Sequence, residues 1–267
     1  MVLQSAASAR SSGLLPFFVL ACVITWLLDL PMVLAFLAGA PLPDHALPMV
    51  GLGAFGPTLA AFVVAYWRRE LGQVFGRWRT DPIWVVVGLL FPLVMHLPAT
   101  LLEVALGGEP AQFFYFPKAP ERIAALVFFS VGEEFGWRGF AYPRVATRYG
   151  PIVGSLLLGA VWGIWHLGMM FTAETGAPST FTIGYVIVEL ALSSVVVAWI
   201  FEKGNRSMLV AFACHAGGHL DNVNLAPESE IRLRILRFVM LVVFAALAAR
   251  ALSKPSATGG AGLANAA

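Results

Sequence analysis

Three short stretches of the chain place ionisable residues inside apolar sequence. They are EEFGWR at 133–138, WGIWH at 162–166 and HAGGH at 215–219. A charge at the centre of a membrane helix costs about 3 kcal/mol on insertion scales, so such residues persist mainly where they pair or perform a function. The two carboxylates, the guanidinium and the three imidazoles therefore predict one buried polar site within a membrane.

The first stretch combines the spacing of an ion pair with a second carboxylate on another side of the helix. Glu134 and Arg138 are four residues apart and share a helix face, so pairing lowers the cost of burying both. Glu133 lies about 100° around the helix and is predicted to point toward other segments. A carboxylate placed in this way suits a general base or acid. The alternative is a purely structural Glu–Arg pair that locks two helices together.

The second stretch places an aromatic ring one helical turn before an imidazole. Trp162 is predicted to shield His166 from lipid and to restrict its rotamers. The alternative is an interfacial tryptophan belt with an incidental histidine, because Trp is enriched where helices leave the bilayer.

The third stretch places His215 and His219 one turn apart on the same face. This spacing is that of a helical metal pair, and it equally suits two hydrogen-bond donors aimed at one oxygen. The two glycines between them favour close approach of another backbone or of a substrate. Ordinary small-residue helix packing is the alternative interpretation.

Composition places these motifs in a membrane protein. The 267 residues are 59% hydrophobic and 12% charged, and the mean hydropathy is +0.80. Soluble domains carry about 25% charged residues. The net charge is +2, with Lys and Arg scattered between apolar runs, which argues against a nucleic-acid partner. Cys22 and Cys214 lie inside apolar segments and predict buried thiols rather than a disulfide.

A membrane-spanning helix needs about 20 apolar residues. The sequence predicts an all-α polytopic bundle of about eight transmembrane helices, in a single membrane domain over 14–252. Residues 1–13 are predicted to be an N-terminal cytoplasmic segment, and the Gly-, Ala- and Ser-rich residues 253–267 a disordered tail. The predicted spans are 14–38, 48–67, 83–107, 120–141, 151–171, 181–201, 207–225 and 233–252.

Loop charges predict the orientation of this bundle. Basic residues follow the second, fourth, sixth and eighth segments, whereas the intervening loops are mostly acidic. The positive-inside rule then places both termini in the cytoplasm. One cluster departs from this pattern, because Arg232, Arg234 and Arg237 open the last helix on the outer side, with Glu228 and Glu230 as candidate partners. Structural pairing is the prediction for the remaining polar residues of the segments, which are Asp29, His96, Glu103, Glu189, Asp221 and Asn222.

Taken together, the motifs resemble the CPBP or ABI family of intramembrane proteases, which includes the type II CAAX prenyl endopeptidases. That family carries Glu-Glu-x-x-x-Arg, then aromatic-x-x-x-His, then His-x-x-x-Asn or Asp. Residues 133–140 match the first element, Trp162 with His166 the second, and His215 the third. The resemblance covers roughly 120–225. His219 stands where the family usually has Asn, which puts full activity in doubt.

The resemblance implies a peptidase acting on a membrane-associated protein or peptide, in the plasma membrane of a bacterium or archaeon. Glu133 and His166 would position and deprotonate a water, and His215 with His219 would stabilise the oxyanion. Glu134 and Arg138 would orient their helix. No cofactor is required in this version. In a second version zinc or another divalent metal is held by Glu133, His166 and His215.

Two functions of other classes are kept as alternatives. One is a catalytically impaired membrane scaffold or immunity protein of the same fold, which the replaced Asn favours. The other is a proton-coupled transporter, because buried Glu and His are typical of carriers. Carriers usually show paired inverted repeats, and the sequence shows no internal repeat.

Overall fold

The computed structural model describes residues 13–107, 120–171, 177–220 and 227–254. Secondary structure in these ranges is helical, apart from an isolated bridge between Arg77 and Ser207. The helices are α2 (Leu14–Leu37), α3 (Ala46–Gly53), α4 (Gly56–Trp67), α5 (Pro82–Ala105), α6 (Pro120–Glu134), a π-helix (Phe135–Ala141), α7 (Tyr142–Tyr149), α8 (Pro151–Trp165), α9 (Thr180–Lys203), α10 (Met208–Leu220) and α11 (Pro227–Leu252).

Each of the eight predicted segments is mainly helical over its described residues, which confirms an all-α integral membrane bundle. By length and composition α2, α5, α9 and α11 can each cross a membrane, and α3 with α4 make a further candidate span that is bent by 47°. The apolar helices α8 and α10 are shorter, and α6 continues into the π-helix. Large apolar side chains stay exposed on the outer faces, as lipid contact requires; Leu15, Leu27 and Leu34 of α2 are examples.

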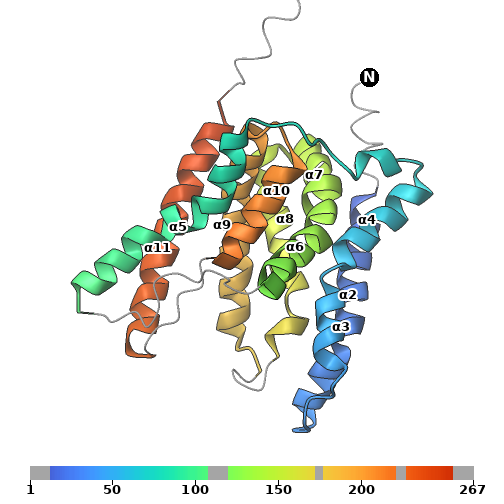
Figure 1. Cartoon of the computed structure of the whole chain (residues 1–267), viewed down its shortest axis with the longest axis horizontal. Coiled ribbons are helices and arrows are strands. Elements are labelled where there is room, and N and C mark those ends of the chain that lie inside the picture. Colours follow the sequence, from blue (N-terminus) through green and yellow to red (C-terminus); the bar gives the residue numbers. More distant parts are fainter. Residues whose placement is uncertain (1–12, 108–119, 172–176, 221–226, 255–267) are drawn as a thin grey trace, which may run out of the picture.

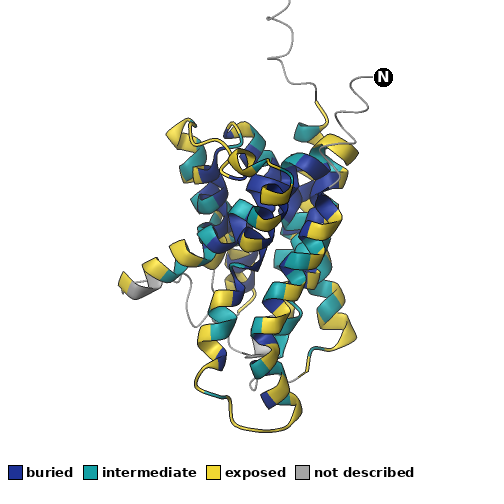
Figure 2. Cartoon of the chain, turned by 90° about the vertical axis from the view of Figure 1, so that its right-hand side faces the viewer, coloured by how far each residue is buried: buried dark blue, intermediate teal, exposed yellow. Residues whose placement is uncertain are grey.

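The helices form three groups around a buried centre (Figure 1). In that view α2, α3 and α4 lie on one side, and α5 with α11 on the other, with α6 to α10 between them. Helix α8 packs on α9, and α5 packs on both α10 and α11. Figure 2 shows that buried residues concentrate where these groups meet, whereas the outer faces and the loops are exposed. The polar motifs belong to this central group.

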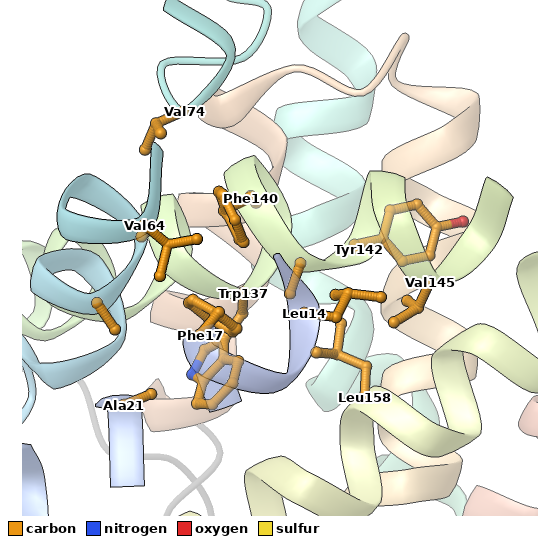
Figure 3. Packing of buried hydrophobic residues seen from close by; sticks show 14 of the residues in the cluster. Leu14, Phe17, Ala21, Val64, Val74, Trp137, Phe140, Tyr142, Val145 and Leu158 are labelled. Atoms are coloured by element: carbon orange, nitrogen blue, oxygen red, sulfur yellow. The ribbon is translucent and has the colours of Figure 1, made fainter. Parts of the chain in front are cut away.

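An aromatic cluster anchors the central group to α2 (Figure 3). Phe17 packs edge-on against Trp137, with ring centroids 5.6 Å apart, and lies 5.0 Å from Phe140. Trp137 in turn contacts Trp165 at 6.0 Å. These four rings are fully buried. Because buried aromatic pairs dominate packing energetics, the cluster fixes the segment after α6 relative to the end of α8.

The π-helix was not predicted from the sequence, and it begins directly after the two adjacent glutamates. Wider turns of this kind frequently occur at functional sites. Gly136 lies within it against α4, where an added Cβ would be 2.5 Å from the carbonyl of Pro57. Only glycine therefore allows this close approach. The short helix α7 that follows was also not predicted, because its eight residues were assigned to a loop.

The loops rich in basic residues meet at one end of the bundle. Arg144, after the fourth predicted span, donates to Glu70, after the second, at 2.8 Å. Arg77 donates to Asn205, which follows α9, at 3.0 Å. The predicted alternation of loop charge thus matches a shared end in the structure. The assignment of this end to the cytoplasm stays a prediction.

Glu70 gives this end an acid-sensitive contact. Burial raises the pKa of the Glu70 carboxyl, but the hydrogen bonds and positive charges of Arg144 and Arg68 lower it by more. The net pKa therefore lies below its ordinary value. The stabilisation is therefore present above the ordinary Glu pKa and is lost as the pH falls through the lowered one. We expect Glu70→Gln to cost about 1 kcal/mol of unfolding free energy at pH 7. Thermal unfolding at several pH values should show this difference closing in acid, and a constant difference would contradict the assignment.

One arginine of the outer cluster pairs with a residue that was not predicted as its partner. Arg232 binds Glu103 of α5 with both its Nε and Nη2 atoms, at 2.6 and 2.5 Å. Structural pairing is thus confirmed for Glu103, and the pair ties α11 to α5. The side chains of Glu228 and Glu230, together with Asp221, Asn222, the N-terminal segment before Gly13 and the tail after Lys254, lie outside the described residues.

Candidate active site

Glu133 is the next-to-last residue of α6, and two indole groups hold its carboxylate. Its Oε2 atom accepts hydrogen bonds from Trp162 Nε1 at 2.9 Å and from Trp137 Nε1 at 3.3 Å. Its Oε1 atom lies 3.7 Å from His215 Nε2. The side chain is buried. One carboxylate oxygen is therefore fixed by neutral donors, and the other faces an imidazole from a different helix.

Glu134 points to a different set of partners, as the 100° rotation predicts. Its Oε1 atom accepts from Arg138 Nη1 at 2.8 Å and from His215 Nδ1 at 2.9 Å. The Arg138 guanidinium also lies over the Trp162 ring, 4.8 Å from its centroid. Glu134 and Arg138 are almost fully buried. The pair thus links the end of α6 to α10 as well as to its own helix.

His215 lies between the two carboxylates, and its contact with Glu134 fixes a proton on Nδ1. An ionised carboxylate only accepts, so Nδ1 of His215 donates to Glu134. Its Nε2 atom lies 3.3 Å from Nε2 of His219, and one of these two nitrogens donates to the other. The centroids of the two imidazole rings are 5.1 Å apart. The predicted common face of α10 is therefore observed.

The glycines between these histidines have separate tasks. Gly217 lies against the backbone of α5, and an added Cβ would collide with the Leu89 carbonyl oxygen. Gly218 lines a cavity, and nothing lies within 4 Å of where its Cβ would be. One glycine therefore permits helix contact, and the other leaves space beside the imidazoles.

His166 follows the last residue of α8, and α2 holds this end of the helix. His166 Nδ1 donates to the Trp162 carbonyl oxygen at 2.8 Å. Trp165 donates through Nε1 to Thr25 at 2.7 Å, and Trp26 donates to the Trp165 carbonyl oxygen at 3.1 Å. Because Trp165 is bonded to α2 through both its indole and its carbonyl oxygen, the position of the adjacent His166 imidazole is fixed relative to α2.

A single cavity of about 660 Å³ brings the three motifs together. All six predicted site residues line it: Glu133, Glu134, Arg138, His166, His215 and His219. His166 and Glu133 also interact electrostatically. Apolar side chains make up most of the remaining wall. The structure thus assembles the predicted set, and the catalytic role of each residue stays a prediction.

Sequence reasoning missed the two indole donors to Glu133. Trp137 lies four residues after Glu133 and Trp162 four before His166, so the spacing did place both rings near the site. The interpretation stopped at shielding and a lipid belt. A buried carboxylate needs hydrogen-bond donors, and Trp is a donor that adds little polarity. That requirement was the signal available in the sequence.

The donors as they lie do not fit a metal centre. Among the described residues, no group of three or more His, Cys, Asp or Glu side chains is arranged to hold a metal ion. The bond of His215 Nδ1 to Glu134 leaves Nε2 as the nitrogen that could bind a metal, and this atom faces Nε2 of His219 at 3.3 Å. Zinc ligands instead converge on one point at about 2.0–2.3 Å.

The other intramembrane polar residues divide into two kinds. Asp29 is fully buried, and its carboxylate oxygens have no hydrogen-bond partner among the described residues, contrary to the predicted pairing. It lies against Gly168, just beyond His166. His96 and Glu189 instead line the cavity. These two were assigned to structural pairing, and the cavity gives them access to whatever occupies it.

The chain is similar in sequence to known membrane peptidases. Residues 115–220 match the family model described as type II CAAX prenyl endopeptidase Rce1-like. The chain is also 27% identical over 173 residues to CAAX prenyl protease 2 of Methanococcus maripaludis. That alignment covers 61% of this chain and 63% of the relative, so the chain matches less than two thirds of the relative's length. The matched segment contains all three motifs.

Proposed function

We propose that the chain belongs to the CPBP family of type II CAAX prenyl endopeptidase-like membrane proteins and that it is an intramembrane endopeptidase. It would hydrolyse a peptide bond of a membrane-associated protein or peptide. The observation that carries the proposal is the Glu133 carboxylate, held by two indoles beside His215 on the wall of a largely apolar cavity. CAAX-type processing is the first substrate class to test.

Glu133 and His166 would activate the attacking water. The two indole bonds fix one oxygen of Glu133 and leave Oε1 toward His215 and the cavity. A water bound between Glu133 and His166 would lose its proton to the carboxylate as it attacks the peptide carbonyl carbon. The same proton would then reach the leaving amine. General base catalysis of this kind contributes about 10²- to 10⁴-fold in rate.

His215 and His219 would stabilise the oxyanion. His215 donates Nδ1–H to Glu134, and the Nε2–H shared between His215 and His219 would be offered to the developing negative charge. His219 adds a second imidazole 3.3 Å away, measured between the Nε2 atoms. Each preorganised donor in a water-poor site contributes about 3 kcal/mol to such a step. Glu134 and Arg138 act through His215 and are positioning residues here.

An impaired scaffold of the same fold is the second candidate. His219 occupies the position at which the resemblance expects Asn, and it bonds to His215 rather than standing independently. A protein that uses the cavity only to bind a partner would keep this arrangement without turnover. It would therefore tolerate loss of the Glu133 carboxylate in a functional assay.

A cleavage assay on purified protein in lipid nanodiscs tests the proposal. We expect a CAAX-type peptide, offered with and without its prenyl group, to be cut once, with the products identified by mass spectrometry. Metal analysis and chelator treatment of the same sample decide between the metal-free and metal-dependent versions. Absence of any cleavage, with binding retained, would favour the scaffold, and proton-dependent solute uptake into vesicles would favour a transporter.

A further inference from the structure

The wall formed by α9 carries a second polar group within the same cavity. Glu189, Ser193 and Val197 follow one another at four-residue intervals, and all three line the cavity. This spacing puts them on a single helix face. His96 joins them from α5. The face is thus polar near the middle of α9 and apolar beyond it.

Glu189 has capacity for further hydrogen bonds. It accepts from Tyr185 at 3.3 Å, a long bond one turn away on the same helix. An ionised carboxylate has about four acceptor positions on its two oxygens. A carboxylate among apolar side chains in a membrane is costly, and in such proteins it generally marks a functional path. The bond with Tyr185 occupies one of these acceptor positions.

The polar and charged neighbours of Glu189 determine which kind of group would suit it. Arg234 and Arg237 of α11 and His96 of α5 interact with it electrostatically. Phe238 of α11 packs on Tyr185, with ring centroids 5.6 Å apart, so the helix that carries these arginines contacts α9 one turn from Glu189. Because the negative charge already has cationic neighbours, a substrate ammonium would meet repulsion as well as attraction. A neutral donor has no such cost.

We propose that Glu189, Ser193 and His96 form a polar subsite that receives a hydroxyl or carboxamide side chain of the peptide substrate, away from the bond that is cut. This inference rests on the proposed peptidase function and specifies its substrate class. The substrate would be apolar where it contacts Met95, Leu190 and Val197, with one neutral hydrogen-bond donor opposite Glu189. Its side chain donates to the Glu189 carboxylate, and Ser193 provides a hydroxyl one turn away.

Paired peptides of equal shape test the subsite. In a series that exchanges Thr for Val, or Gln for Met, at each position around the cleaved bond, one position should favour the donor about tenfold in kcat/KM. Glu189→Leu should abolish this preference. Glu189→Gln should keep it, because the carboxamide oxygen still accepts. Val188→Leu, on the exposed side of the same helix, is the matched control and should leave the preference unchanged.

Several outcomes would overturn the subsite. An unchanged Thr-over-Val preference in folded Glu189→Leu would do so, and so would an equal loss of rate for both peptides, which indicates a structural role. A preference of the wild type for Lys over Thr would contradict the neutral donor. Ser193→Ala, which should weaken the preference, provides a second variant if Glu189→Leu does not fold.

Failure of the peptidase proposal can be told apart from failure of the subsite. Binding of the same Thr and Val peptides is measured on the wild type and on Glu189→Leu without any turnover. If no peptide is cleaved but the Thr peptide binds about tenfold tighter to the wild type alone, the subsite stands and the peptidase function falls. If cleavage occurs and the two peptides bind equally to the wild type, the peptidase function stands and the subsite falls.

Discussion

Replacing Glu133 with Gln is expected to lower kcat/KM for peptide cleavage by about 10²- to 10⁴-fold, with the protein still folded. Gln keeps the shape of the side chain and its acceptor oxygen toward the indoles of Trp137 and Trp162. It cannot take a proton from water. The loss should therefore appear mainly in kcat, which steady-state kinetics in nanodiscs can separate from KM.

The matched control for this variant is Glu202→Gln. Glu202 also accepts from an aromatic residue, Tyr142 at 2.8 Å, and from Arg206, but it lies at the end of α9 outside the cavity. Its replacement should leave kcat unchanged. Cleavage by folded Glu133→Gln at the wild-type rate would remove Glu133 from the mechanism and return the scaffold and metal versions to consideration.

Replacing Arg138 with Met is expected to destabilise the protein by about 3–5 kcal/mol. Removing the guanidinium leaves the Glu134 carboxylate buried without its Arg138 partner, and only the hydrogen bond with His215 remains. The double variant Glu134→Gln with Arg138→Met should recover much of this loss, because no unpaired carboxylate remains. Thermal and denaturant unfolding in detergent measures the stability of the single and of the double variant.

The exposed pair of Arg206 with Glu202 provides the comparison. It has the same four-residue spacing and a 2.7 Å contact, but its side chains are 41% and 25% exposed. Arg206→Met should therefore cost no more than about 1 kcal/mol. If both arginine variants lose the same stability, burial of the Glu134–Arg138 pair is not what makes it strong, and the stabilising role assigned to it is wrong.

Much of the membrane architecture was accessible from hydropathy and loop charge. Apolar runs of about 20 residues have few folded alternatives, because a lipid-exposed backbone must satisfy its hydrogen bonds internally. The eight predicted segments therefore appear as helices with boundaries shifted by a few residues. The bend between α3 and α4 and the π-helix after Glu134 escaped prediction. Both arise where a helix adapts to its neighbours, and periodicity does not record that.

The site shows the same division between local and distant contacts. The pairing of Glu134 with Arg138 and the common face of His215 and His219 follow from four-residue spacing within one helix. The bonds of Glu133 to Trp162 and of Glu134 to His215 join different helices, and the bonded residues are 29 and 81 positions apart in the sequence. Their existence depended on how α6, α8 and α10 pack.

By itself the sequence determined that the chain is a helical membrane protein with three polar motifs too costly to be accidental, since each of those properties depends on residue type and on spacing along one helix. Only the tertiary structure decided which carboxylate faces which imidazole, that two indoles hold Glu133, and that Glu189 and His96 open onto the same cavity. The physical reason is that helix rotation and crossing are set by side-chain packing between segments, and such contacts leave no periodic signal in either partner.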